Sequence, residues 1–274
     1  MDLQATRSTV SEIARAAGAV LMQHYNQPHQ QNTKRTVTDI VTEGDVASEA
    51  VIIPALAQHF PTHHIISEEG GGKGIGAPAE SAEYFWYIDP LDGTSNYANN
   101  IPLFTVSIGL ADRNMHPLVG VVYDPFSDEL FSAARGYGAT LNDRPIQVSA
   151  RQSLQESMLC SGFPYDSLTN PDNNVREWMA FTARTRGLRR FGSIALELSY
   201  IACGRLEGLW EQSVNGWDVM AGIMLVQEAA GQTSDYSGED SQLVYSGRQI
   251  VASNRHIHQE MLDVLHTVRA AQEN

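Results

Sequence analysis

The chain has 274 residues, and 32 acidic against 18 basic side chains give it a formal net charge of −14. Nucleic-acid-binding surfaces are normally basic, so this balance predicts no nucleic-acid partner. The apolar runs fall far short of the roughly 20 residues that span a bilayer, so we expect no membrane partner either.

The cysteines and the first residues indicate a reducing compartment. The start of the chain shows no basic and apolar leader of a secreted protein. Cys160 and Cys203 lie in apolar contexts, where two buried free thiols are favoured over a disulfide. The nine histidines, His256 and His258 among them, show no zinc-site pattern and are expected at the surface. We therefore expect a cytoplasmic protein.

Two helices are expected at the beginning of the chain. Apolar side chains at helical spacing predict the first over residues 3–25. The second is expected to start near Thr42, a capping residue, and Pro54 predicts a kink or a break in it. Its apolar face is expected to comprise Val46, Ala50, Ile53, Ala57 and Phe60. A short strand over 64–67 then leads into Glu68.

The rest of the chain divides near residue 150. Strands are predicted at 84–88, 103–111, 117–123, 129–134 and 145–148, and their short connections indicate a largely antiparallel meander. Further strands are predicted at 157–162, 188–191, 206–211 and 249–253, alternating with helices at 171–185, 193–203, 217–230 and 255–270. We expect one catalytic unit made of residues 1–150 and 151–274, with its site where these halves meet.

The most informative stretch runs from Trp86 to Tyr97. An apolar strand ends in Asp89 and Asp92, and Gly93 follows where a helix could begin. Carboxylates bind hard divalent cations, and the free N–H groups of a glycine-led helix start favour an anion. The stretch therefore predicts a phosphate site with metal ions, which would also reverse the local negative charge. The alternative is an ordinary acidic turn.

Four further acids stand at helix starts or strand ends, namely Asp45, Glu68, Glu211 and Asp218. Each alone is more often a helix cap or a solvated strand end than a residue of a site. Spacing along the chain does not by itself bring them together.

Two signatures resemble the inositol monophosphatase family of lithium-sensitive, magnesium-dependent phosphatases. The run from Asp89 to Tyr97 is similar to the family motif Asp-Pro-(Ile/Leu)-Asp-Gly-Thr-(Thr/Ser)-Asn-(Phe/Tyr). The run from Trp217 to Gly222 is similar to its second signature, Trp-Asp-x-x-(Ala/Gly)-(Gly/Ala). The resemblance implies a layered αβαβα sandwich of the α/β class, often a homodimer, that binds two or three Mg²⁺ ions and hydrolyses a small phosphorylated polyol or sugar.

The resemblance also implies roles for single residues. Metal ligands are implied for Glu68, Asp89, Asp92, Asp218 and the carbonyl of Leu91. Catalytic positions are implied for Glu68, Asp45, Thr94 and Lys34; Asp45 and Thr94 would orient the attacking water. The substrate side is implied to comprise Asp92, Gly93, Thr94, Gly192, Ser193, Ile194, Glu211 and Asp218, with the N–H groups of Gly93 and Thr94 holding the phosphate.

Ile194 departs from the family pattern, in which this position is usually small. Its side chain either narrows the pocket or turns into the core. Because these two orientations of Ile194 leave the shape of the pocket open, inositol 1-phosphate is the default substrate and not a deduction from the residues. Relatives with the same metal core act on histidinol phosphate, fructose 1,6-bisphosphate, 3'-phosphoadenosine nucleotides or NADP, and a regulatory binding role on the same fold is a further alternative.

Overall fold

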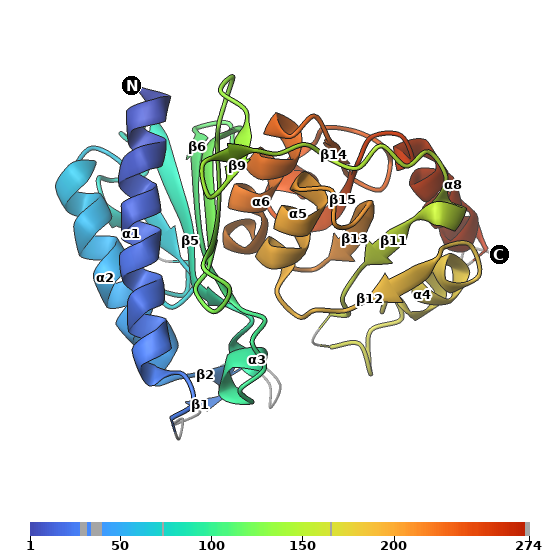
Figure 1. Cartoon of the computed structure of the whole chain (residues 1–274), viewed down its shortest axis with the longest axis horizontal. Coiled ribbons are helices and arrows are strands. Elements are labelled where there is room, and N and C mark those ends of the chain that lie inside the picture. The colour runs from blue at the N-terminus through green and yellow to red at the C-terminus, as the bar shows by residue number, and fades with distance from the viewer. Residues whose placement is uncertain (28–31, 34–39, 73, 165, 272–274) are drawn as a thin grey trace.

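Alternating layers of helices and sheets make up the protein (Figure 1). The computed structural model describes residues 1–27, 32–33, 40–72, 74–164 and 166–271. Helices α1 and α2 cover one face of an eight-stranded sheet, and α5 and α6 lie between it and a five-stranded sheet. Helices α4 and α8 cover the outer face of the second sheet. The expected αβαβα fold is confirmed.

The first layer is formed by α1 (Leu3–His24) and α2 (Glu43–His59). Thr42 caps α2 as expected, and the helix continues through Pro54 without a break. The expected apolar face of α2 is wrong at Val46 and Ala50, which are exposed, whereas its Ile53, Ala57 and Phe60 pack against the core. Asp45 and Ser48, which were not expected on that face, are fully buried. Both polar side chains are buried because they hydrogen-bond to partners near the strand β5, described below.

The eight-stranded sheet is a meander extended by one parallel pair. Its order is β10-β9-β8-β7-β6-β5-β3-β4. The neighbours from β5 to β10 pair antiparallel, as expected, and β3 pairs parallel to β5. The strand expected over 145–148 is wrong, since only Arg144–Pro145 pairs there. The strands are β3 (His64–Ser67), β4 (Ile75–Gly76), β5 (Tyr84–Asp92), β6 (Thr105–Asp112), β7 (Pro117–Asp124), β8 (Glu129–Ala134), β9 (Ala139–Leu141) and β10 (Arg144–Pro145). A separate pair joins β1 (Asn32–Thr33) to β2 (Ile40–Val41).

The second sheet has the order β12-β11-β13-β15-β14 and mixes parallel with antiparallel pairs. Its strands are β11 (Met158–Cys160), β12 (Gly187–Arg189), β13 (Gly208–Gln212), β14 (Gln232–Ser234) and β15 (Gln249–Ser253). The remaining helices are α3 (Thr94–Ala98), α4 (Val175–Thr182), α5 (Ile194–Ala202), α6 (Gly216–Glu228), α7 (Gln242–Tyr245) and α8 (His258–Ala270), with a 3-10 turn at Leu154–Glu156. The helix expected over 171–185 is shorter, because buried Asn174 takes a left-handed φ of 66° just before α4.

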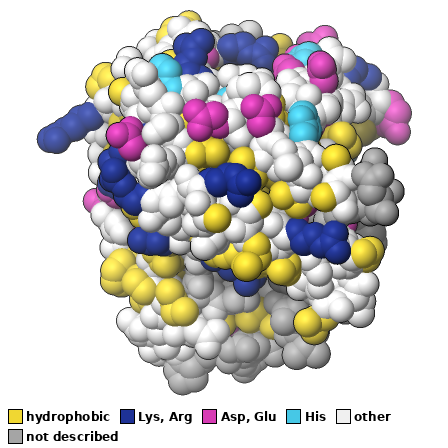
Figure 2. Space-filling model, turned by 90° about the vertical axis from the view of Figure 1, so that its right-hand side faces the viewer, with side chains coloured by type: hydrophobic (Ala, Val, Ile, Leu, Met, Phe, Trp, Pro, Cys, Tyr) yellow, Lys and Arg dark blue, Asp and Glu magenta, His cyan; other side chains and the backbone are white. Residues whose placement is uncertain are grey.

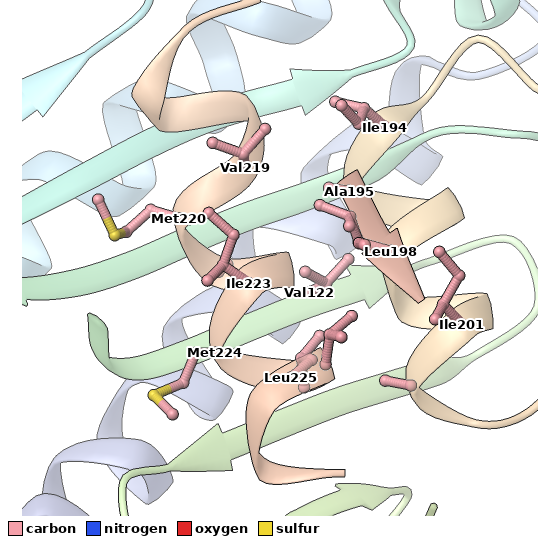
Figure 3. Close-up of a cluster of buried hydrophobic side chains, with 14 of the residues drawn as sticks. Val122, Ile194, Ala195, Leu198, Ile201, Val219, Met220, Ile223, Met224 and Leu225 are labelled. Carbon is pink, nitrogen blue, oxygen red and sulfur yellow. The ribbon is translucent and has the colours of Figure 1, made fainter. Parts of the chain in front are cut away.

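The central core lies between the two sheets, and α5 and α6 supply nearly half of its buried residues (Figure 3). Helix α6 lies unusually close to the first sheet. A Cβ on Gly109 would stand 2.8 Å from the backbone nitrogen of Ala221, and one on Gly120 would collide with the Ala221 carbonyl. These two glycines therefore let the α6 backbone rest directly on β6 and β7, which fixes the first turn of α6 relative to β5.

Cys160 and Cys203 are free, as expected. None of the helices in the described part of the chain is long and apolar enough to cross a membrane. The expected surface position is wrong for His63 and His258, which are 6% and 2% exposed.

Buried His258 makes stability depend on pH. Its ring lies between the hydroxyls of Ser234 and Ser253, at 2.8 and 2.9 Å, and burial lowers its pKa from 6.5 to about 4. The unfolded chain binds the proton first, so this contribution to stability is complete above about pH 6.5 and is lost as the pH falls towards about 4. We expect His258→Gln to abolish about 2 kcal/mol of the decrease in unfolding free energy between about pH 7.5 and about pH 5.

Urea titrations at both pH values check this expectation. The control is the exposed neighbour His256, because His256→Gln should leave the decrease in unfolding free energy between the two pH values unchanged. Equal decreases in the wild type and in His258→Gln would contradict it.

Candidate active site

Three carboxylates from distant parts of the chain meet between the two halves. Glu68, Asp89 and Asp218 each offer an oxygen within 4.8 Å of the others. Glu68 follows β3 and Asp89 lies in β5, and these strands are parallel neighbours, so both acids stand at the same end of the sheet. Asp218 lies in the first turn of α6, where it also closes a capping box with Asn215. The geometry suits a shared cation.

The end of β5 is shaped to present its acids. The pairing of β5 with β6 shifts register between Asp89 and Asp92. Asp89 accepts a hydrogen bond from the Leu91 N–H at 3.0 Å, and the Pro90 carbonyl accepts one from Ser48 at 2.7 Å. A local irregularity of this kind re-aims side chains at a strand end.

Burial and the crowding of like charges both disfavour the ionised carboxylates of this cluster. Burial, followed by the charges of Glu68, Asp92 and Asp218, raises the pKa of Asp89 well above its usual value. Burial and then Glu68 and Asp92 do the same to Asp218. A divalent cation would offset both the cost of burying these charges and the repulsion between them. Carboxylate oxygens are the ligands that Mg²⁺ prefers. The donor set therefore fits the Mg²⁺ expected from the sequence.

Asp92 joins this group from the other side of the bend. One of its oxygens accepts hydrogen bonds from the Ser193 hydroxyl and the Ala195 N–H, both at 2.7 Å. Burial raises the pKa of Asp92 to about 7, although the bonds from Ser193 and Ala195 oppose the rise. Ser193, expected on the substrate side, thus also supports an acid of the cluster.

The turn after Asp92 requires glycine. Gly93 has a φ of +97°, and a Cβ there would stand 2.8 Å from the Leu103 carbonyl. Helix α3 begins directly after it at Thr94. The Thr94 hydroxyl lies 3.0 Å from a carboxylate oxygen of buried Asp45 and 3.1 Å from the Leu91 carbonyl. The other Asp45 oxygen accepts bonds from both the N–H and the hydroxyl of Thr42, each at 2.7 Å, so this carboxylate is held rigidly next to Thr94.

The second half supplies the remaining expected residues. Buried Glu211 lies in β13 and accepts a hydrogen bond from the Gly162 N–H at 2.6 Å. Gly192 and Ser193 form the turn before α5. Ile194 is only 8% exposed and belongs to the central core, where Figure 3 places it at the start of the helix that carries Ala195 and Leu198. Lys34 lies outside the described residues.

Some supporting residues were not expected from the sequence. Ser48 holds the Pro90 carbonyl, Asn96 donates to the Phe191 carbonyl at 2.6 Å, and Glu197 accepts from the Phe191 N–H at 2.7 Å. Asn96 lies inside the recognised motif, and Glu197 is a lone acid in an otherwise apolar helix, which is a signal that could have marked it.

The chain is similar to known proteins over most of its length. The model described as "Inositol monophosphatase family" matches residues 2–272. An inositol-1-monophosphatase of Synechocystis sp. is 44% identical over 265 residues, which cover 96% of this chain and 90% of that protein. A Nus factor SuhB of Pseudomonas aeruginosa is 43% identical over 209 residues, 75% of each chain. The solved inositol monophosphatase of Anabaena (Nostoc) sp. superimposes with a TM-score of 0.87 at 43% identity over 97% of both chains.

The burial of Ile194 leads to a test of its role. If its side chain packs in the core, Ile194→Ala should lower the free energy of unfolding by about 2–4 kcal/mol. The same variant should leave the relative kcat/KM values of a set of phosphate monoesters unchanged. Denaturant titration and a substrate series measure the two effects.

The matched control is Ile201→Ala, a fully buried isoleucine near the far end of the same helix. A changed substrate ranking in Ile194→Ala alone would mean that the side chain contacts the substrate.

Proposed function

The chain belongs to the inositol monophosphatase family, and we propose that it is a Mg²⁺-dependent phosphomonoesterase whose substrate is a small polyol phosphate, with inositol 1-phosphate as the first candidate. The observation that carries this proposal is the convergence of Glu68, Asp89 and Asp218 on one point. The strand end that carries Asp89 leads into a glycine turn and Thr94, whose hydroxyl hydrogen-bonds to buried Asp45 of α2.

We assign the metal ligands as the family resemblance suggests. Glu68, Asp89 and the Leu91 carbonyl would hold one Mg²⁺, and Asp89, Asp92 and Asp218 a second, with Glu68 available to a weaker third. Bound Mg²⁺ supplies positive charge that attracts a phosphate ester to an acidic site and stabilises the charge that develops as the ester bond breaks.

The chain's own groups would orient the reactants. The N–H groups at Gly93 and Thr94 begin a helix and have no partner within it, so they are available to phosphate oxygens. The Thr94 hydroxyl can accept a hydrogen bond from the attacking water while it donates its own proton to Asp45. Because Thr42 already fixes the other Asp45 oxygen, the water would be presented in one direction.

The alcohol side of the substrate would face the second half of the chain. Glu211 has acceptor capacity beyond its bond to Gly162 and can receive a hydrogen bond from a polyol hydroxyl. The turn at Gly192 and Ser193 lies on the same side. The name of the Synechocystis relative supports inositol 1-phosphate over the other substrates that the sequence leaves open.

A second candidate is a binding role that does not need turnover. The 43% identity to a protein named Nus factor SuhB favours it specifically. The two candidates are compatible on one fold, and a variant that removes turnover without unfolding the protein separates them.

We also infer a homodimer. Val175 and Met179 are 48% and 67% exposed and stand four residues apart, on one side of α4. Figure 2 shows hydrophobic side chains gathered across the middle of the face that contains α4 and α8. An exposed apolar area of this kind is typical of a subunit interface.

Asp89→Asn tests the proposed function. Removing the ligand assigned to both main cations should lower kcat/KM on inositol 1-phosphate by at least about 100-fold, since several kcal/mol of transition-state stabilisation is lost. Phosphate release from a panel of polyol, sugar, histidinol and nucleotide monophosphates, with and without Mg²⁺, is the measurement. A cellular function that survives Asp89→Asn would support the second candidate.

The control variant is Asp124→Asn, which changes a buried aspartate at the end of β7 and should retain activity. The proposal fails if metal-replete wild-type protein is inactive on the whole panel, or if Asp89→Asn keeps more than about a tenth of the wild-type rate.

Met179→Asp tests the dimer. A charge placed in an apolar interface is costly, so we expect the variant to be monomeric at concentrations at which the wild type is dimeric in light scattering. Leu243→Asp, at a 43% exposed leucine on α7, should remain dimeric. A monomeric wild type would contradict the inference.

A further inference from the structure

The turn that precedes α5 is held from two sides at the backbone of a single residue, Phe191. An oxygen of Glu197 accepts a hydrogen bond from the Phe191 N–H at 2.7 Å. The Asn96 side chain donates to the Phe191 carbonyl at 2.6 Å and to the Leu103 carbonyl at 2.8 Å. We call Glu197 and Asn96, with the backbone of Phe191 between them, the Phe191 clamp. It ties α3 in the first half of the chain to α5 in the second.

The clamped turn leads directly to the groups that hold Asp92. Gly192 has a φ of +77°, which reverses the chain, and Ser193 then caps α5. The Ser193 hydroxyl and the Ala195 N–H both donate to one oxygen of Asp92 at 2.7 Å. A shift of the Phe191 backbone would therefore move both donors together and turn the Asp92 carboxylate.

The burial of the Glu197 carboxyl group requires a physical reason. It is only 3% exposed and lies in a helix whose other residues are apolar or small, with the exceptions of Ser199 and Tyr200. A carboxyl group is costly to bury unless it is hydrogen-bonded, and an apolar side chain would fit this core without that cost. The hydrogen bond from the Phe191 N–H is the compensation that the structure provides.

We propose that Glu197 and Asn96 are positioning residues that set the Asp92 carboxylate for cation binding, although neither is itself a metal ligand. The inference rests on the proposed function, because it takes Asp92 as a ligand of the second cation. Groups that orient metal ligands typically change metal affinity by about 10- to 100-fold when they are removed.

Two substitutions separate the reach of Glu197 from its charge. Glu197→Gln keeps the length and an acceptor oxygen but loses the charge. Glu197→Asp keeps the charge but is one methylene too short to reach Phe191. We expect Glu197→Asp to weaken Mn²⁺ and Mg²⁺ binding by about 10- to 100-fold and Glu197→Gln to weaken it by less than about threefold. Calorimetric titration of the full chain without substrate measures both, and kcat at saturating metal is recorded beside it.

Glu207→Asp is the matched control. Glu207 is also a buried glutamate that accepts a backbone N–H, from Met158 at 2.7 Å, but it precedes β13 at the end away from Glu211. Its variant should lower the melting temperature without changing metal affinity. The proposal is overturned if Glu197→Asp behaves like Glu207→Asp, which means a purely structural role. It is also overturned if Glu197→Gln weakens binding more than Glu197→Asp, which means that charge and not reach matters.

Asn96→Ala tests the other half of the clamp and keeps the proposal testable if a Glu197 variant does not fold. It should weaken metal binding at least about tenfold, and an unchanged affinity overturns the role of Asn96. The calorimetric readout needs no turnover. A wild-type protein that binds Mg²⁺ but hydrolyses no monoester would refute the proposed function, while the comparison of the variants would still decide the clamp.

Discussion

Repulsion among closely spaced carboxylates is the constraint on which the rest of this structure depends. Glu68, Asp89 and Asp218 converge within 4.8 Å, and Asp92 adds a fourth negative group whose charge acts on Asp89 and Asp218. Such a group is unfavourable in a folded protein unless cations or hydrogen-bond donors compensate it. The Leu91 N–H and the Ser193 and Ala195 donors supply part of that compensation, and the remainder is what a divalent cation would supply.

Packing of the two halves is what brings the acids together. Asp89 comes from the first sheet and Asp218 from a helix of the second half, and they meet because α6 rests on Gly109 and Gly120. A side chain at either glycine would push the helix away from the sheet and carry Asp218 with it. The packing of the central core therefore also sets the geometry of the site, because the apolar residues of α6 determine the position of Asp218.

Local sequence patterns predicted much of the fold and of the candidate site, and the features that they missed have physical explanations. The recognised motif placed Asp89, Asp92 and Gly93 at a strand end, and the alternation of short segments predicted the meander. Periodicity did not predict the whole buried face of α2, because the search for an apolar face assigns polar Asp45 and Ser48 to the solvent side. Both are buried through hydrogen bonds to residues more than forty positions away, and sequence spacing does not report such bonds. The same limit hid the burial of His258 between Ser234 and Ser253, and the link from Asn96 to Phe191.

The central claim is that the acid cluster is a cation site, and crystals soaked in Mn²⁺ test it most directly. Anomalous scattering locates the ion without reference to activity or substrate. We predict a peak within about 2.3 Å of an Asp89 carboxylate oxygen, with Glu68 or Asp218 as a further ligand. Peaks found only at other positions, or none at millimolar Mn²⁺, would contradict the account.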